Sequence, residues 1–167
     1  MSAAERIAML LNAYVEGPRL VTAAVRGLSA DELRFTPGQG HWSIHQHVVH
    51  LADADLVLAA RLRYILADPG VAVIPFDQER WGRTLDYAGR SLDASLALLR
   101  AVREATADLL RQMPPEAWQR VGQHPQAGPQ TVEQIVAHAV DHVDHHLRTI
   151  ARRRREYARA QEPRRPA

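Results

Sequence analysis

Three capping-box sequences, each followed by residues with helical periodicity, constrain the fold of this chain more than any other feature. In a capping box, a Ser or Thr and a Glu or Gln three residues later satisfy the first unpaired backbone N–H groups of a helix. The boxes begin at Ser29, Ser43 and Thr131. The first predicts a short helical turn. The other two predict long helices, from Ser43 to about Ala67 and from Thr131 to at least Arg152.

Two further long helices are predicted by apolar residues that recur every three or four positions. One runs from about Ala3 to Arg26, although Gly17-Pro18 should kink or interrupt it. The other runs from about Ser91 to Met113 and ends at two consecutive prolines. Residues 35–40, 71–82 and 121–130 are predicted to be loops. Four long helices with short and medium connections predict an all-α protein, a four-helix bundle.

Length and composition indicate one domain that folds without disulfide bonds. A chain of 167 residues buries enough apolar surface to fold without disulfides or a structural metal. The absence of cysteine excludes disulfides, thiolate metal ligands and a cysteine nucleophile. No window of about 18 apolar residues predicts a membrane span, and we expect a cytoplasmic protein. Residues 1–152 are predicted to form the bundle and residues 153–167 a basic, frayed tail.

The basic tail does not by itself predict a nucleic-acid partner. All 21 basic residues are arginines, and several of them follow Ile150, but the formal net charge is only +2. Cations at a helix C-terminus complement the helix dipole. Tyr157 stands alone, so no aromatic side chains alternate with the arginines as base stacking would require.

Histidine is the residue type that most strongly indicates function. The chain has nine histidines, and eight of them fall in two clusters, around the second and in the fourth long helix. Two imidazoles at positions i and i+4 of a helix can point nitrogen atoms at one metal ion. The spacing leaves five candidate ligands, namely His47, His50, His138, His142 and His146. Helical spacing alone does not choose between the pairs 138/142 and 142/146.

Two sequence segments resemble the DinB/YfiT-like superfamily. The first is Trp42-Ser43-Ile44, followed after five residues by His50-Leu51-Ala52-Asp53, and the second is His142-Val143-Asp144-His145-His146 with Ile150 after it. Residues 74–81 also resemble the loop of the YfiT branch, and the resemblance covers about residues 5 to 152.

The resemblance implies a bundle with an up-down-down-up arrangement and a divalent ion, nickel or zinc, held by three histidines. Carried over by motif, the ligands are His50, His142 and His146. His47 and His138 lie outside the matched motifs and are reserve ligands. Bundles of this type often pair through helix faces, so we also expect a homodimer.

Three neutral ligands leave a coordination position for water or substrate, as in catalytic zinc sites. The undiminished charge of the ion would acidify a bound water or thiol. The sequence therefore predicts a metal-dependent enzyme acting on a small molecule, either a hydrolase or, as the resemblance also implies, an S-transferase using a low-molecular-weight thiol. The alternative is a non-catalytic metal-binding or stress-response module, in which a fourth ligand such as His138 closes the site.

A carboxylate is expected near such a site, either to orient a ligand or to accept a proton. Asp53, three residues after His50, is the predicted orienting group, because carboxylates often hold metal-bound histidines. Four other carboxylates are further candidates for the base: Asp77, Glu79, Asp141 and Asp144.

Overall fold

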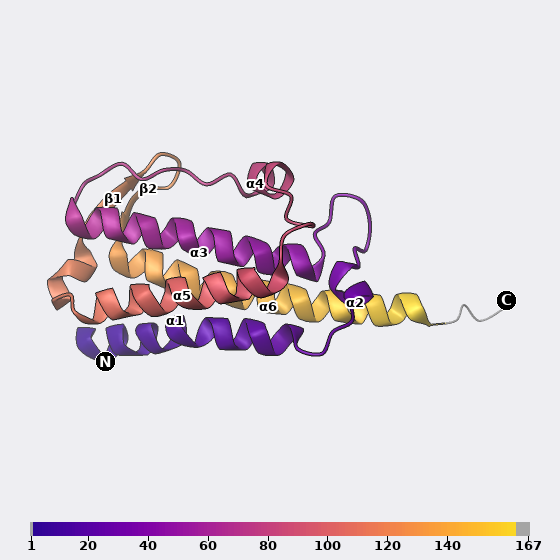
Figure 1. Cartoon of the computed structure of the whole chain (residues 1–167). Coiled ribbons are helices and arrows are strands. Elements are labelled where there is room, and N and C mark those ends of the chain that lie inside the picture. The colour runs from indigo at the N-terminus through magenta and orange to yellow at the C-terminus, as the bar shows by residue number, and fades with distance from the viewer. Residues whose placement is uncertain (1, 163–167) are drawn as a thin grey trace.

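The computed structural model describes residues 2–162 as a bundle of four long helices (Figure 1). Ser43 and Thr131 cap their helices as predicted, each with both hydrogen bonds of a capping box. The helices and strands are, in chain order, α1 Ala3–Val25, α2 Ala30–Arg34, α3 Ile44–Ala67, α4 Gln78–Thr84, α5 Leu92–Arg111, the 3-10 helix η1 Pro115–Gln119, β1 Val121–His124, β2 Gly128–Thr131 and α6 Val132–Gln161.

The direction of the long helices confirms the up-down-down-up arrangement. In Figure 1, α1 and α6 run toward one end of the bundle, and α3 and α5 run toward the other. Helices α3 and α5 pack against each other although they are parallel. Residues 68–91 must therefore return along the whole bundle before α5 begins, and this crossover lies above α3 in Figure 1.

The crossover is more ordered than the predicted loop. Its second half contains α4. Asp77 caps this helix, because its carboxylate accepts a hydrogen bond from Arg80 N at 3.0 Å. Its first half pairs with β1, where Val73 N donates to Gln123 O at 3.0 Å and Gln123 N donates to Val71 O at 2.8 Å.

The prediction of a loop for residues 121–130 is wrong. Strands β1 and β2 form an antiparallel hairpin there, with Val121 opposite Thr131 and His124 opposite Gly128. The turn depends on Gly128, which has a φ of 73° that side-chain-bearing residues rarely adopt. The strands are only four residues long, too short for an alternating apolar pattern to indicate them.

Helix α1 passes through Pro18 without the predicted interruption. Because proline has no N–H, the carbonyl of Tyr14 has no helical donor, and Arg103 Nη1 of α5 donates to it instead at 2.8 Å. The same buried guanidinium binds Asp55 of α3 through two hydrogen bonds, at 2.8 and 3.2 Å, and donates to Ala139 O of α6 at 2.6 Å. One arginine therefore joins all four long helices.

Helix α6 continues to Gln161, so residues 153–161 are helical rather than frayed. Arg153 explains part of this length, because it is buried and its Nε donates to Trp42 O at 3.1 Å. Residues 163–167 of the predicted tail lie outside the described residues. No helix within residues 2–162 is both long and apolar enough to cross a membrane.

Candidate metal centre

Helices α3 and α6 bring together the three histidines that the resemblance implies as ligands. His142 Nε2 lies 3.1 Å from His50 Nε2 and 3.1 Å from His146 Nε2. One ligand atom from each of these residues lies within 4.8 Å of the others, and within residues 2–162 this is the group that could hold a metal ion. Helices α3 and α6 pack side by side in opposite directions. His50 therefore meets His142 and His146, which follow it in the chain by 92 and 96 residues.

The separations of His142 Nε2 from the other two nitrogens fit an ion better than they fit a hydrogen-bonded cluster. Ligands about 2.05 Å from a tetrahedral ion stand about 3.3 Å apart, close to the observed 3.1 Å. Without an ion, His142 Nε2 faces two nitrogens but carries at most one hydrogen or one lone pair.

Burial keeps these imidazoles uncharged. It lowers the pKa of His50 to about 3 and that of His142 to about 4, with neighbouring histidines adding a smaller effect. The pKa of His146 is lowered well below its ordinary value for the same reason. Each ring therefore has a free lone pair at pH 7, as metal binding requires.

Aromatic rings enclose His50. Trp42, just before α3, packs on it at 5.0 Å between ring centroids. Phe76 of the crossover stacks on it at 5.9 Å, with an interplanar angle of 11°, and Tyr87 lies at 6.4 Å. His50 Nδ1 is buried and has no hydrogen-bond partner among the described residues. On its Nδ1 side, packing rather than hydrogen bonding therefore holds this ring.

Asp53 does not make the contact with a ligand that was predicted for it. The carboxylate is buried, but its Oδ2 accepts a hydrogen bond from Arg90 Nη1 at 2.6 Å. The neighbouring His45 donates from Nε2 to Arg90 O at 2.7 Å. Asp53 and His45 thus attach the end of the crossover to α3, and a catalytic role for Asp53 stays a prediction.

The other predicted residues divide into those near the centre and those away from it. His138 stacks on His142 with 5.7 Å between centroids and does not belong to the three-nitrogen group. Asp77 caps α4, and Asp141 and Asp144 are exposed on α6. Among the predicted carboxylates, Glu79 lines a cavity together with the ligand histidines His142 and His146.

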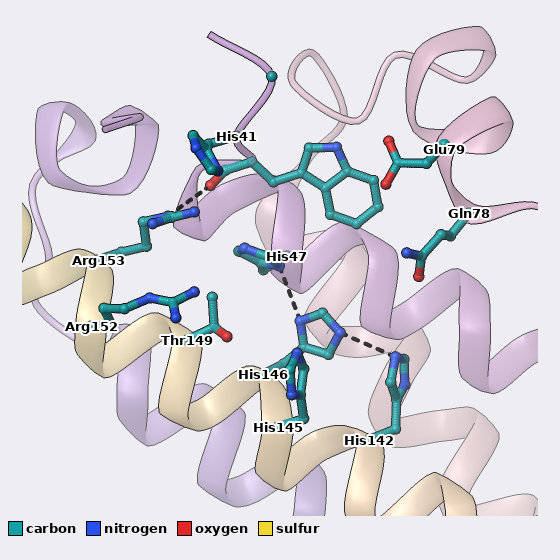
Figure 2. Close-up of a pocket in the computed structure, with 12 residues that line it drawn as sticks. His41, His47, Gln78, Glu79, His142, His145, His146, Thr149, Arg152 and Arg153 are labelled. Carbon is teal, nitrogen blue, oxygen red and sulfur yellow. Dashed lines mark hydrogen bonds between the residues drawn. The ribbon is translucent and has the colours of Figure 1, made fainter. Parts of the chain in front are cut away.

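Two cavities border the three histidines. The first, here called the arginine cavity, has a volume of about 340 Å³, and its lining includes His142, His146, Gln78, Glu79, Arg152 and Arg153 (Figure 2). The second, the phenylalanine cavity, has a volume of about 300 Å³, and its lining includes His50, His142, Gln78, Phe76, Val57 and Leu58. His142 and Gln78 line both cavities, so molecules in either one would approach the same centre.

Sequence reasoning missed the cavity-lining roles of Gln78 and Arg152. Gln78 begins α4, a helix that was not predicted, and Arg152 was assigned to the end of the bundle, next to the tail. For Arg152 the sequence signal is helical spacing, which places it six residues after His146, about 9 Å along the axis. For Gln78 the signal is its place in residues 74–81, the segment that resembles the YfiT loop.

Together, the bundle and its largely buried three-histidine group define a class of helical proteins with a candidate metal site between two antiparallel helices. Comparison with known proteins identifies the family. The profile of the DinB superfamily matches residues 13–150, and the chain belongs to this superfamily.

Relatives in two bacilli are named for metal-dependent hydrolysis. A "putative metal-dependent hydrolase" of Oceanobacillus iheyensis is 27% identical over 140 residues, which cover 84% of this chain and 81% of the relative. Another protein so named, from Geobacillus kaustophilus, is 30% identical over 135 residues, which cover 80% of this chain and 76% of the relative.

A solved structure has the same fold. YfiT from Bacillus subtilis superimposes with a TM-score of 0.87 and 26% sequence identity, covering 95% of this chain and 90% of that one. It is described as "a probable metal-dependent hydrolase with an unusual four-helix bundle topology". The match supports the helix arrangement, including the parallel packing of α3 and α5.

Proposed function

We propose that this protein is a metal-dependent enzyme in which His50, His142 and His146 hold one zinc or nickel ion and a small molecule reacts beside it. The observation that carries the proposal is the convergence of the Nε2 atoms of three neutral histidines that line two cavities. When bound, such an ion supplies a Lewis acid that polarises a substrate oxygen and acidifies a coordinated water or thiol.

The chain supplies a carboxylate on the cavity side of the centre. Glu79 lies on α4 and lines the arginine cavity with His142 and His146 (Figure 2). We assign it the role of accepting a proton from the attacking water or thiol. Asp53 is less suited to this role because it is paired with Arg90 at 2.6 Å.

The arginine cavity favours a substrate with an anionic group. Arg152 and Arg153 line it, and Glu79 is the acidic residue in the lining. Glu156 binds Arg153 at 2.7 Å but lies 3.9 Å from Arg152, so the charge of Arg152 is the less neutralised of the two. A carboxylate or phosphate on the substrate would be attracted there.

Hydrolysis is the reaction that the names of the relatives support. Thiol transfer is the second candidate, because the phenylalanine cavity also borders His142 and has room for another reactant. Both reactions use the same three histidines and differ in the nucleophile that Glu79 would deprotonate.

The test is turnover by the zinc- or nickel-loaded protein on esters and amides with and without a carboxylate, measured with and without an added thiol. We expect turnover of the anionic compounds, loss of turnover in His50→Ala, and a drop of about 100-fold in kcat for Glu79→Gln. Asp141→Asn, an exposed carboxylate next to His142, is the matched control and should react as the wild type does.

Stimulation by thiol would favour the transferase. Absence of turnover in the metal-loaded wild type under all conditions would reject the proposal that the protein is an enzyme and would favour a non-catalytic metal-binding module.

A further inference from the structure

His47 lies outside the three-nitrogen group but contacts one of its members, and it lines the arginine cavity together with His142 and His146. It lies one turn before His50 on α3, and its Nδ1 lies 3.0 Å from Nδ1 of His146 (Figure 2). The rings of His47 and His146 are 5.0 Å apart and tilted by 55°. The contact is therefore a hydrogen bond between two ring nitrogens, and it joins α3 to α6 a second time.

The direction of this hydrogen bond follows from the other nitrogen of His146. The Nε2 of His146 faces His142 and belongs to the group that could hold an ion. A neutral imidazole carries one hydrogen, so a ring that offers its Nε2 lone pair to an ion carries that hydrogen on Nδ1. His146 must then donate from Nδ1, His47 must accept at Nδ1, and His47 must carry its own hydrogen on Nε2.

The surroundings of His47 agree with an accessory role rather than that of a fourth ligand. Neither of its nitrogens belongs to the three-residue group. Its Nε2 is buried and has no hydrogen-bond partner among the described residues, and the ring packs edge-to-face with Trp42 at 5.6 Å. Nδ1 is therefore the atom through which His47 meets another polar group.

We propose that His47 is a positioning residue for the ligand His146, which it holds in the Nδ1–H tautomer and in the ring orientation that presents Nε2 to the ion. The inference rests on the proposed metal site. Metal-bound histidines usually donate their second N–H to a carboxylate or a carbonyl. Here the acceptor is an imidazole, that of His47. The predicted carboxylate, Asp53, binds Arg90 instead.

The first test is the zinc affinity of the purified chain, measured by competition with a chromogenic chelator. His47→Phe keeps a ring but removes the acceptor, so we expect binding weakened about 10- to 100-fold. His47→Gln returns an acceptor oxygen and should recover most of the affinity. His145→Phe is the matched control, because His145 is exposed and also packs its ring on that of His146, at 5.2 Å; we expect it to bind zinc as the wild type does.

The second test is a long-range ¹H–¹⁵N NMR spectrum of the zinc-loaded wild type, which reports which nitrogen of each histidine carries the hydrogen. We expect Nδ1–H for His146 and Nε2–H for His47. This spectrum needs no variant and so does not depend on whether His47→Phe folds.

Three results would overturn the inference. A hydrogen on Nδ1 of His47, a zinc-coordinated His47, or an unchanged affinity in both His47 variants would each do so while leaving the three-histidine site intact. A wild type that binds no zinc or nickel would instead remove the proposed function and this inference together.

Discussion

At the scale of single residues, Arg152 is the side chain that we expect to select the substrate. It lies at the exposed edge of the arginine cavity, where its charge is only weakly offset by Glu156 at 3.9 Å. A charged hydrogen bond to a substrate anion is worth about 1.5 kcal/mol, or roughly tenfold in binding. We predict that Arg152→Gln raises KM for an anionic substrate about tenfold and leaves kcat nearly unchanged, because the contact is remote from the reacting atoms.

The matched control is Arg155→Gln, which removes the same charge from an exposed position of α6 outside the cavity lining. Steady-state kinetics at fixed ionic strength measures both variants. Equal KM values for Arg152→Gln and Arg155→Gln would show that the cavity does not recognise the charge.

The residue pattern alone predicted that a histidine metal site exists, but not which histidines belong to it. The i, i+4 spacing left His138 and His146 equivalent as partners of His142, and it was the resemblance that selected His146. The structure shows why the distinction matters, since His138 stacks on His142 while His146 directs Nε2 at the centre. The pairing of Asp53 with Arg90 could not be predicted from the sequence, because Arg90 lies 37 residues away in the chain and is brought to Asp53 by the crossover.

At the scale of helices and strands, Arg103 replaces the hydrogen bond that Pro18 removes from α1, and Gly17 makes room for it. A Cβ added at Gly17 would lie 2.4 Å from Arg103 Nη1. In an exposed helix, Gly→Ala stabilises by about 1 kcal/mol. Here we predict the opposite sign, with Gly17→Ala lowering the free energy of unfolding by about 1–3 kcal/mol through overpacking.

Urea denaturation followed by circular dichroism measures the change. Asn12→Ala, an exposed position of the same helix, is the control and should be neutral or slightly stabilising. A Gly17→Ala protein more stable than the wild type would mean that Arg103 is not held against α1 as described.

The same elements show where sequence reasoning succeeds and where it stops. Capping boxes at Ser43 and Thr131 are local chemistry, so they located both helix starts correctly. The continuity of α1 depends on Arg103, which is distant in the chain, and the pattern around Pro18 could not reveal it. The hairpin likewise depends on tertiary pairing with the crossover, through Val71 and Val73.

At the scale of the whole molecule, the buried histidines make the metal-free protein sensitive to acid. Burial lowers the pKa of His47 and His142 to about 4 and that of His50 to about 3, while unfolded histidines titrate near 6.5. Between these values the unfolded chain binds more protons than the folded one, so stability falls as pH decreases.

We therefore predict that the free energy of unfolding is nearly constant above pH 7 and decreases from about pH 6.5 downward. The slope is about 1.4 kcal/mol per pH unit for each histidine that stays neutral in the folded state. Urea unfolding of chelator-treated protein between pH 7.5 and 5 measures it, and His50→Phe should lower the slope by about one histidine's share. A wild type as stable at pH 5 as at pH 7.5 would show that these rings are not buried as neutral groups.

In the proposed site, three histidines of two helices hold one ion and leave room for a reactant. The most direct measurement is an anomalous difference map at the zinc edge, from crystals of the zinc-loaded protein. We predict one peak about 2.0–2.1 Å from Nε2 of His50, His142 and His146, with a water or small molecule in the remaining position. No peak between these nitrogens, or a peak whose fourth ligand is a protein side chain such as His138, would contradict the account.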